Sequence, residues 1–332
     1  MPPKVSVVIT AYQKVQFLPR TLRSVLDQTF QDFEVIVVDD GSTDGTREVV
    51  EGFASNDSRV KYIYQENQGP GSARNAGIRV AQADLIALLD GDDVWFPDKL
   101  EHQVRVMEAF PNVDLLFTNS QYVSTLETKH PVHTVNYYHD YVLAHFTLRP
   151  LEGFDGVYLI GDNRFPCQLV LKNVFNLSTL MLRKCAWAVI GGFNEEFRGP
   201  EDLDFWVRAA LKKCQFAYTS HVGAVYYKNE TSLVQASERS YLEQLKHALY
   251  AHRSSEYEPI RDATQRLVHK RFRQLVVFYT YQRQPRKAWQ AFRQSMSYGI
   301  SIRTLLMAAA SFVGPVPLTV YRKARQFTFR QT

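Results

Sequence analysis

Strand-like apolar runs alternate with helical segments over the first 120 residues of this chain. Five largely apolar runs have the length of strands: 5–10, which is rich in β-branched residues, 33–38, 60–64, 85–89 and 115–118. Between them apolar residues recur at helical spacing, as at Leu18, Leu22 and Val25. This order predicts an α/β fold in which a mostly parallel sheet carries helices on both faces, like a Rossmann-type nucleotide-binding half.

Polar residues follow three of these runs, at the point where each strand is expected to end. The three groups are Thr10-Ala11-Tyr12, Asp39-Asp40 and Asp90-Gly91-Asp92-Asp93. Ligands of parallel α/β sheets bind outside the carboxyl ends of the strands. The sequence therefore predicts a binding site at this edge of the sheet.

The acidic segment from Asp90 to Asp93 suggests a metal site. Carboxylates packed this closely repel one another and raise each other's pKa unless a cation is present. Mg²⁺ and Mn²⁺ prefer oxygen ligands, commonly one or two carboxylates together with substrate phosphates. A metal-diphosphate site is the functional interpretation, and a polar turn is the structural alternative.

The other polar groups also have two interpretations. Asp39 and Asp40 could accept hydrogen bonds from a base or ribose, or cap a helix. Tyr12 could stack on a nucleobase or serve packing. Arg74 and Asn75 follow a glycine-rich turn, where backbone N–H groups and an arginine could meet phosphate, although Arg74 could equally be a surface residue.

Glu201 and Asp202 stand at the expected start of a helix that also carries Trp206. Acidic residues in the first turn are favoured by the helix dipole, which is the structural explanation. The functional interpretation is a general base directed across the strand ends.

Five segments in this order resemble the family 2 inverting glycosyltransferases with the GT-A fold: VSVVITAYQK, VVDDGSTDGT, ENQGPGSARNAGI, LLDGDDVW and GPEDLDFWVR. The resemblance covers about residues 4–232. It implies an enzyme that binds a nucleotide-diphosphate sugar with Mn²⁺ or Mg²⁺ and transfers the sugar to an acceptor hydroxyl with inversion. A UDP-sugar donor, a glycan or lipid-linked acceptor, and hexosyl or N-acetylhexosaminyl transfer in polysaccharide or glycoconjugate synthesis are the expectations.

The resemblance also implies roles for single residues. On the donor side, the base pocket and nucleotide would be contacted by Thr10, Ala11, Tyr12, Asp39, Asp40, Arg74 and Asn75. In the DxD-like segment, Asp90 would contact sugar or ribose, and Asp92 or Asp93 would hold the metal, with Asp92 also near the donor. On the acceptor side, Asp202 would be the catalytic base, beside Glu201, and Trp206 would help to shape the site.

One departure from the family concerns the segment after the last expected strand. Relatives often carry a histidine there, whereas this chain reads Tyr227-Lys228-Asn229-Glu230-Thr231-Ser232. A role for this loop at the metal or diphosphate is therefore in doubt, and Lys228 could face the diphosphate instead.

Two other protein classes compete with this interpretation. A dinucleotide-binding oxidoreductase needs GxGxxG after the first strand, but residues 10–14 contain no glycine. A non-catalytic carbohydrate-binding or nucleotide-sugar-binding relative stays the alternative, and the retained Asp92, Asp93 and Asp202 argue against it.

The charge distribution divides the chain near residue 238. Residues 1–238 carry 22 Lys and Arg against 30 Asp and Glu, whereas residues 239–332 carry 17 against 4. We expect a catalytic domain at 1–238, with a nucleotide-sugar-binding half at 1–120 and an acceptor-binding half at 121–238. A basic helical extension at 239–332 would follow, with helices at 241–252, 259–281, 285–298 and 302–312.

The basic extension suggests a polyanionic neighbour, and we expect an anionic membrane surface rather than nucleic acid. The run 304–321 has 18 residues without charge, the lower limit for a membrane span, but Gly314, Pro315 and Pro317 interrupt it. A surface-lying or re-entrant segment is therefore favoured over a straight spanning helix. A helical hairpin on the catalytic domain and a contact in a homodimer remain alternatives.

Three scattered cysteines without a CxxC motif, and an N-terminus without a signal-peptide pattern, favour a reducing compartment. The expected location is the cytoplasm, with peripheral attachment to the cytoplasmic face of the membrane.

Overall fold

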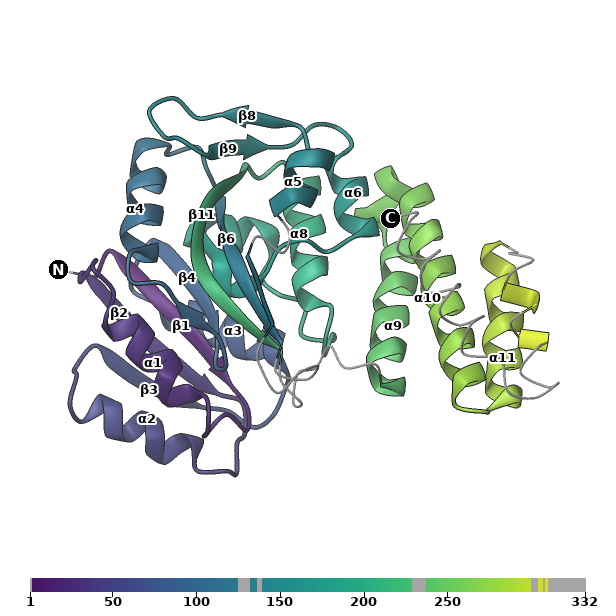
Figure 1. Ribbon diagram of the computed structural model, residues 1–332, viewed down its shortest axis with the longest axis horizontal. Coiled ribbons are helices and arrows are strands. Elements are labelled where there is room, and N and C mark those ends of the chain that lie inside the picture. Colours follow the sequence, from purple (N-terminus) through teal and green to yellow (C-terminus); the bar gives the residue numbers. More distant parts are fainter. Residues whose placement is uncertain are drawn as a thin grey trace. The chain divides into compact units, whose positions relative to one another are not determined.

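The computed structural model describes residues 2–124, 132–135, 139–228, 237–299, 304–306 and 308–309. The chain divides into two compact units, Met1–Leu233 and Val234–Thr332. The first unit is an α/β structure built on one large sheet, and the described part of the second is helical (Figure 1). The assignment of 1–120 to the donor and 121–238 to the acceptor stays a prediction.

The first unit alternates strands and helices as the sequence predicts. Its strands are β1 Val5–Ala11, β2 Phe33–Asp39, β3 Val60–Tyr64, β4 Leu85–Asp90, β5 Val94–Trp95, β6 Leu115–Ser124, β7 Val132–Val135, β8 Leu148–Pro150, β9 Val157–Ile160, β10 Leu180–Arg183 and β11 Phe216–Lys228. Its helices are α1 Leu18–Leu26, α2 Thr46–Ala54, α3 Pro70–Val80, α4 Lys99–Ala109, α5 His139–His145, α6 Phe165–Leu171, α7 Lys184–Ile190 and α8 Glu201–Leu211, with the 3₁₀ turn η1 Leu177–Thr179.

The sheet has the strand order β3-β2-β1-β4-β10-β6-β11-β9-β8. The first four strands are parallel, as predicted, but β10 runs antiparallel to both β4 and β6. The residues before β10 explain its direction, because Ser178 in η1 accepts a hydrogen bond from the backbone N–H of Asp90 at the carboxyl end of β4. A strand that starts at this edge must run opposite to β4, so the second half of the sheet is mixed.

Alternate residues of β1 face opposite sides of the sheet, as a strand period of two requires. Val5, Val7 and Ile9 share one core with α1, α2 and α4. On the other face α3 lies so close that a Cβ on Gly77 would be 2.4 Å from a methyl of Val8. The carboxyl edge of the sheet is therefore held between two helical layers.

An aromatic cluster fills the second half of the first unit. Phe117 of β6 stacks on Phe175 at 4.1 Å and meets the edge of Trp206 at 5.0 Å between ring centroids. These rings are buried, and Trp206 lies on α8. Aromatic packing of this kind therefore fixes α8 against the sheet.

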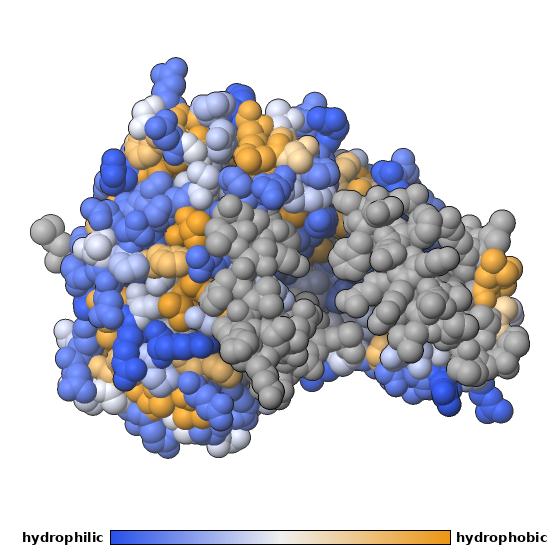
Figure 2. All heavy atoms as spheres, in the orientation of Figure 1, coloured by the Kyte–Doolittle hydropathy of each residue, from blue (hydrophilic) through white to orange (hydrophobic). Residues whose placement is uncertain are grey.

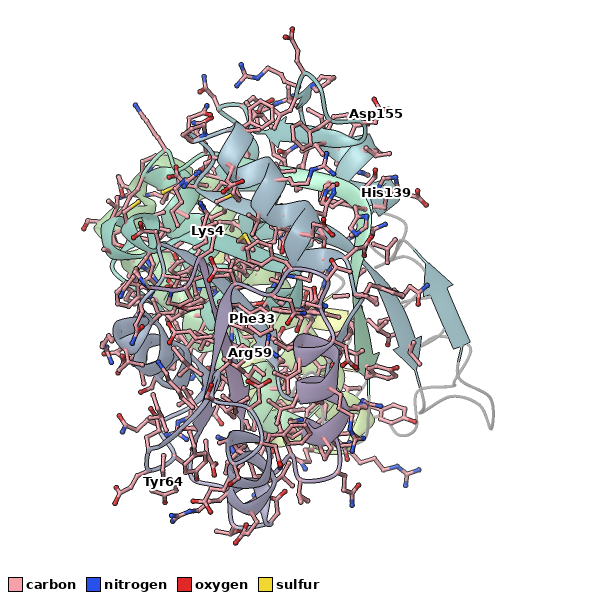
Figure 3. The ribbon with its side chains drawn as sticks, turned by 90° about the vertical axis from the view of Figure 1, so that its left-hand side faces the viewer. Lys4, Phe33, Arg59, Tyr64, His139 and Asp155 are labelled. Carbon is pink, nitrogen blue, oxygen red and sulfur yellow. The ribbon has the colours of Figure 1, made fainter. Side chains whose placement is uncertain are left out.

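Figure 3 labels residues at both ends of the first strands. At the amino end of β2 the guanidinium of Arg59 lies 4.5 Å from the ring centre of Phe33 and covers it. At the carboxyl end of β3, Tyr64 is 58% exposed. On the face seen in Figure 2, hydrophilic side chains are interspersed with small apolar groups over the described surface.

The second unit consists of α9 Glu238–Arg253, η2 Ser255–Ile260, α10 Arg261–Tyr281, α11 Pro285–Ser295 and η3 Met296–Tyr298. The Ser237 side chain caps α9 by accepting a hydrogen bond from the N–H of Ser240 at 3.1 Å. Helices occupy the three ranges expected between 241 and 298. The expected helix at 302–312 and the uncharged run 304–321 lie mostly outside the described residues. Among the helices that are described, none combines the length and apolarity needed to cross a membrane.

Two glycines allow a matched test of the packing between α3 and the sheet. We expect Gly77→Ala to lower the free energy of unfolding by about 1–3 kcal/mol, because its Cβ has no room beside Val8. Gly52→Ala in α2 meets nothing within 4 Å, so it should raise the free energy of unfolding by about 0.5–1 kcal/mol. Urea denaturation followed by circular dichroism measures both. Equal effects of the two substitutions would contradict the close contact.

Candidate functional site

The carboxyl ends of β1, β2 and β4 meet at one edge, as the sequence predicts. In the sheet register Ala11 lies beside Asp39, and Thr10 lies beside Asp90. The hydroxyl of Thr10 is 3.5 Å from a carboxylate oxygen of Asp90. The structure therefore brings the first and last of the predicted polar groups into contact.

The loop after β1 is clamped to the loop after β2. Gln13 donates its N–H to the Ser42 hydroxyl at 2.9 Å, and Val15 donates its N–H to Asp44 at 3.0 Å. Gln13 has a positive φ of 54°, which is uncommon for a residue with a side chain. This clamped loop leaves Tyr12 49% exposed, where a flat ligand could stack on its ring.

Asp39 is buried and its carboxylate serves the protein itself. It accepts hydrogen bonds from the N–H of Ser42 and the hydroxyl of Tyr62, both at 2.8 Å. Burial raises the pKa of Tyr62, and the hydrogen bond that Tyr62 donates to Asp39 raises it further. Asp39 therefore supports the turn that follows β2.

Asp40 is also buried, and it holds the segment that leads to α3. It accepts hydrogen bonds from the side chain of Gln65 at 2.7 Å and from the N–H groups of Gln68 and Gly69, each at 2.9 Å. The contact between Asp40 and a base stays a prediction. The alternative role as a helix cap is not observed for either aspartate, because Gly45 and Gly69 occupy the N-cap positions of α2 and α3.

Arg74 is the central cation of the site. It is 4% exposed and donates to Glu201 at 2.6 Å and to Asp90 at 2.8 Å. Burial by itself lowers the pKa of Arg74, but the charges of Asp90 and Glu201 outweigh this effect and raise the pKa. The alternative of a surface position for Arg74 is excluded, because its guanidinium joins the carboxyl end of β4 to the start of α8.

Asn75 points away from the strand ends. Its amide donates to the carbonyl of Phe193 at 2.8 Å and accepts from the N–H of Phe193 at 2.9 Å and the indole of Trp187 at 3.1 Å. Neighbouring residues on a helix face different directions, and here Arg74 and Asn75 reach different partners. Asn75 therefore braces the segment before α8, and its place near the nucleotide stays a prediction.

Asp93 is the most enclosed member of the acidic segment. It is 1% exposed and accepts hydrogen bonds from the hydroxyl of Ser178 at 2.5 Å and from the N–H of Tyr227 at 3.1 Å. Burial raises the pKa of Asp93 well above its ordinary value, and the charges of Asp92 and Asp90 add to the rise. Because both of its oxygens are bound by protein donors, the expected role of Asp93 as a metal ligand is not supported here.

Asp92 is held by two cations of the α1 region. Its carboxylate lies 2.5 Å from the ammonium of Lys14, and its carbonyl accepts from Arg20 at 2.9 Å. The side chains of Asp92 and Asp90 are 13% and 32% exposed, so both are more accessible than Asp93.

The donor atoms at this edge suit a hard cation. Within the described ranges no group of three His, Cys, Asp or Glu side chains has metal-binding geometry. Asp92 nevertheless already binds a positive charge, that of Lys14, and Asp90 carries a second carboxylate at the end of β4. Mg²⁺ and Mn²⁺ need one or two carboxylates when substrate phosphates complete the coordination. Asp90 and Asp92 therefore fit the expected metal.

Asp202 occupies the first turn of α8 and is only partly buried. Its oxygens accept from the N–H of Leu203 and from the side chain of Asn173, both at 2.6 Å. Burial raises the pKa of Asp202 while these two hydrogen bonds oppose the rise. A carboxylate with a raised pKa and a fixed orientation has the properties of a general base.

Glu201 and Trp206 lie deeper than the sequence suggests. Glu201 is 3% exposed, binds Arg74, and has a second oxygen, Oε2, without a hydrogen-bond partner among the described residues. Burial raises the pKa of Glu201 to about 7, with Arg74 opposing and Asp202 adding to the rise. Trp206 is fully buried in the aromatic cluster. Neither side chain is placed to touch an acceptor, and Trp206 shapes the site only through α8.

Three residues of this site have no signal in the sequence. Lys14 binds Asp92, Ser178 binds Asp93, and Asn173 binds Asp202. Each is a polar residue in a connecting segment, and each partner lies at least 29 positions away along the chain. No periodicity or spacing rule connects such pairs.

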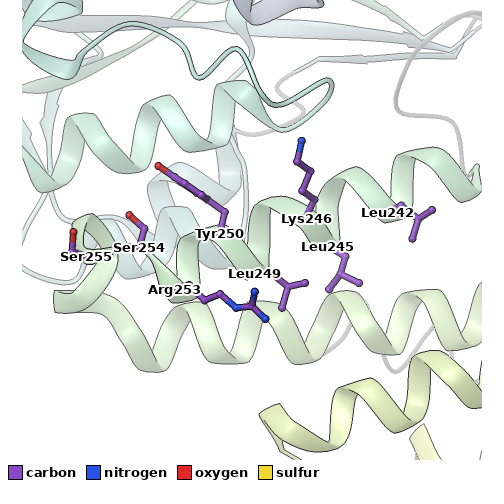
Figure 4. A pocket seen from close by; sticks show the side chains of 8 residues that line it. All are labelled: Leu242, Leu245, Lys246, Leu249, Tyr250, Arg253, Ser254 and Ser255. Carbon is purple, nitrogen blue, oxygen red and sulfur yellow. The ribbon is translucent and has the colours of Figure 1, made fainter.

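A groove of about 710 Å³ lies on α9 in the second unit (Figure 4). Its lining combines leucines with two basic side chains: Leu242, Leu245, Lys246, Leu249, Tyr250, Arg253, Ser254 and Ser255. None of the acidic site residues described above lines this groove.

Comparison with known families matches residues 6–175 to the family model of glycosyl transferase family 2. An uncharacterized glycosyltransferase of Rickettsia conorii, RC0461, is 31% identical over 216 residues, which are 63% of this chain and 30% of that protein. The chain spans between 17% and 34% of the length of the first four curated relatives that it matches.

Solved glycosyltransferase structures resemble the chain in fold. Residues 1–349 of Staphylococcus aureus TarS, in complex with UDP-GlcNAc, match with a TM-score of 0.60 and 18% identity over 92% of this chain and 83% of that chain. The mannosyltransferase PcManGT of Pyrobaculum calidifontis, in complex with GDP-Man and Mn²⁺, matches with a TM-score of 0.58 and 18% identity over 100% of this chain and 84% of that chain. The predicted GT-A type α/β fold with a helical C-terminal region is confirmed.

The buried Glu201 predicts a pH dependence of stability. Its pKa is about 7 in the folded protein and near its ordinary value of 4.5 in the unfolded chain, so the folded state binds the proton more tightly. The stability that the proton provides is complete below about pH 4.5 and is lost as the pH rises through about 7.

We therefore expect wild type to lose on the order of 1–3 kcal/mol of unfolding free energy relative to Glu201→Gln between about pH 5 and 8. Urea denaturation at one-unit intervals of pH measures the difference. If the unfolding free energies of the two proteins changed in parallel with pH, the raised pKa of Glu201 would be contradicted.

Proposed function

Because the chain belongs to glycosyl transferase family 2, we propose that it transfers a sugar from a nucleotide-diphosphate sugar to an acceptor hydroxyl. The observation that carries the proposal is the double contact of Arg74, which binds Asp90 at 2.8 Å and Glu201 at 2.6 Å. Asp202, the next residue, is thereby held near the acidic strand ends. The carboxyl edge of the sheet, where the donor would bind, and the candidate base Asp202 are thus held in a fixed arrangement, as a transfer reaction requires.

The donor that we propose is a UDP-sugar carrying a hexosyl or N-acetylhexosaminyl group. The exposed ring of Tyr12 beside the clamped loops offers a surface on which a base can stack. The likeness in fold to TarS, which was solved with UDP-GlcNAc, supports UDP, whereas the complex of PcManGT contains GDP-Man. The proposed acceptor is a glycan or a lipid-linked glycan, in polysaccharide or glycoconjugate synthesis.

Asp90 and Asp92 would hold the divalent cation, Mn²⁺ or Mg²⁺. When bound, such a cation acts as a Lewis acid that stabilises negative charge on the leaving diphosphate. The likeness in fold to PcManGT, which was solved in complex with GDP-Man and Mn²⁺, supports this expectation. Asp93 would not ligand the cation, because Ser178 and Tyr227 donate hydrogen bonds to its oxygens. It would instead hold the acidic segment from Asp90 to Asp93 in place.

Asp202 would take the proton of the acceptor hydroxyl as that oxygen bonds to the anomeric carbon. The bond between this carbon and the phosphate oxygen breaks, and the electron pair leaves with the nucleoside diphosphate. Attack from the face opposite the leaving group inverts the anomeric centre, and no protein nucleophile is needed. General-base catalysis of this kind contributes typically 10²–10⁴-fold. Asn173 and the N–H of Leu203 would keep the carboxylate oriented.

Two substitutions separate the base from the donor pocket. We expect Asp202→Asn to lower kcat by at least about 10²-fold while the Kd for UDP changes little, because the base acts on the acceptor. Tyr12→Ala should do the reverse and weaken UDP binding first. Isothermal titration calorimetry and a product assay measure the two effects.

Glu196→Gln, an exposed change in the segment before α8, is the control and should alter neither quantity. Near wild-type kcat in Asp202→Asn would contradict its role as the base. Wild type that binds UDP-sugars but transfers nothing to any acceptor would favour the non-catalytic alternative.

We also propose that the protein acts in the cytoplasm, attached to the cytoplasmic face of the membrane. The groove on α9 supports this, because three leucines lie beside the basic Lys246 and Arg253 (Figure 4). The strong excess of Lys and Arg over Asp and Glu in residues 239–332 points the same way. Basic residues near anionic headgroups contribute about 1 kcal/mol each.

Vesicle flotation at low salt tests this attachment. We expect the full chain to float with vesicles of phosphatidylglycerol and phosphatidylcholine, and not with phosphatidylcholine alone. Leu242→Glu should reduce flotation, because Leu242 is 45% exposed on α9 and a carboxylate there repels the surface. Val189→Glu, at a residue of the first unit that is 60% exposed, is the matched control. Wild type that stays in solution with both vesicles would refute the proposal.

A further inference from the structure

Lys14 lies on the clamped loop after β1. Its N–H donates to the hydroxyl of Thr46 at 3.2 Å, and the preceding Gln13 has the positive φ described above. From this fixed backbone the side chain reaches Asp92, where the ammonium and a carboxylate oxygen are 2.5 Å apart. The geometry of this loop thus places the Lys14 ammonium against Asp92, which is one of the two candidate metal ligands.

Arg20, the second cation beside Asp92, is bound differently. Its guanidinium donates to the carbonyl of Asp92 at 2.9 Å, and it lies 3.9 Å from the ring centre of Tyr227 and 5.2 Å from that of Phe17. These contacts involve the backbone of Asp92 and two aromatic rings. Arg20 is therefore part of the framework, whereas the Lys14 ammonium contacts the carboxylate itself.

The pair of Lys14 and Asp92 is partly exposed, with side-chain exposures of 17% and 13%. A lysine ammonium is a compact charge on a flexible stem, so it can move by side-chain rotation without disturbing the loop. The face of Phe17, 5.7 Å from the ammonium, offers a second favourable contact close by.

A divalent ion and an ammonium that contact the same carboxylate repel each other, because they are like charges a few ångströms apart. A divalent ion that binds Asp92 therefore weakens the contact of the Lys14 ammonium and favours its release. The diphosphate of a bound donor then supplies new negative charge next to the ion, since phosphates complete the coordination of such ions.

Resting on the proposed function, we propose that Lys14 is an exchangeable counter-ion of Asp92. Without ligands it neutralises Asp92. When the divalent ion and the donor bind, it leaves Asp92 and pairs with the diphosphate. Lys14 is thus a positioning residue that opposes metal binding alone and favours metal and donor together, which is a coupling between two ligands.

Mn²⁺ titrations of the full chain, without nucleotide, test the exchange directly. We expect Lys14→Gln to bind Mn²⁺ about 5-fold more tightly than wild type, because the competing ammonium is gone. In saturating Mn²⁺ the same variant should bind UDP about 5-fold more weakly, because the diphosphate loses a partner. Lys14→Arg, which keeps the charge, should restore both affinities toward wild type.

Lys4→Gln is the matched control, since Lys4 precedes the same strand at its other end and forms an exposed pair with Glu108 at 2.7 Å (Figure 3). It should change neither affinity. Thermal unfolding of each variant checks that the fold is intact. Unchanged or weaker Mn²⁺ binding by a folded Lys14→Gln would overturn the exchange. Wild type that binds neither Mn²⁺ nor UDP would overturn the proposed function, and this inference with it.

Discussion

The buried guanidinium of Arg74 is the interaction on which the site depends. It joins Asp90 at the end of β4 to Glu201 at the start of α8, residues separated by 111 positions, at 2.8 and 2.6 Å. Removing one partner of such a buried pair leaves an uncompensated charge, which typically costs about 3–5 kcal/mol. The strand end and the helix start are therefore held in one geometry, and Asp202 inherits its position from that connection.

The acidic residues of this edge divide into two groups by their partners. Asp39, Asp40 and Asp93 are buried and accept hydrogen bonds from turns and loops of the protein. Asp90 and Asp92 keep partial exposure and are paired with the cations of Arg74 and Lys14. The first group builds the loops that present the second.

Helix α8, which carries the candidate base Asp202, is held by buried side chains. Trp206 packs its buried ring against Phe117, while Arg208 binds Asp204 at 2.7 Å and the carbonyls of Ile190 and Gly192, both at 2.7 Å. Helix α8 therefore has little freedom to rotate. The packing of α8 also partly buries Asp202, and this burial raises the pKa of its carboxyl group.

The sequence by itself determined the alternation of strands and helices, the parallel start of the sheet and the edge at which polar residues gather. These follow from the local sequence, because a run such as 5–10 is apolar, rich in β-branched residues and of strand length wherever it stands. The antiparallel entry of β10, the burial of Trp206 and the pairings of Lys14, Asn173 and Ser178 were decided by tertiary structure. Each depends on which distant segments meet, and local spacing carries no information about that. The division of the aspartates into structural and chemical groups has the same cause, since only the fold shows which carboxylates are reached by protein donors.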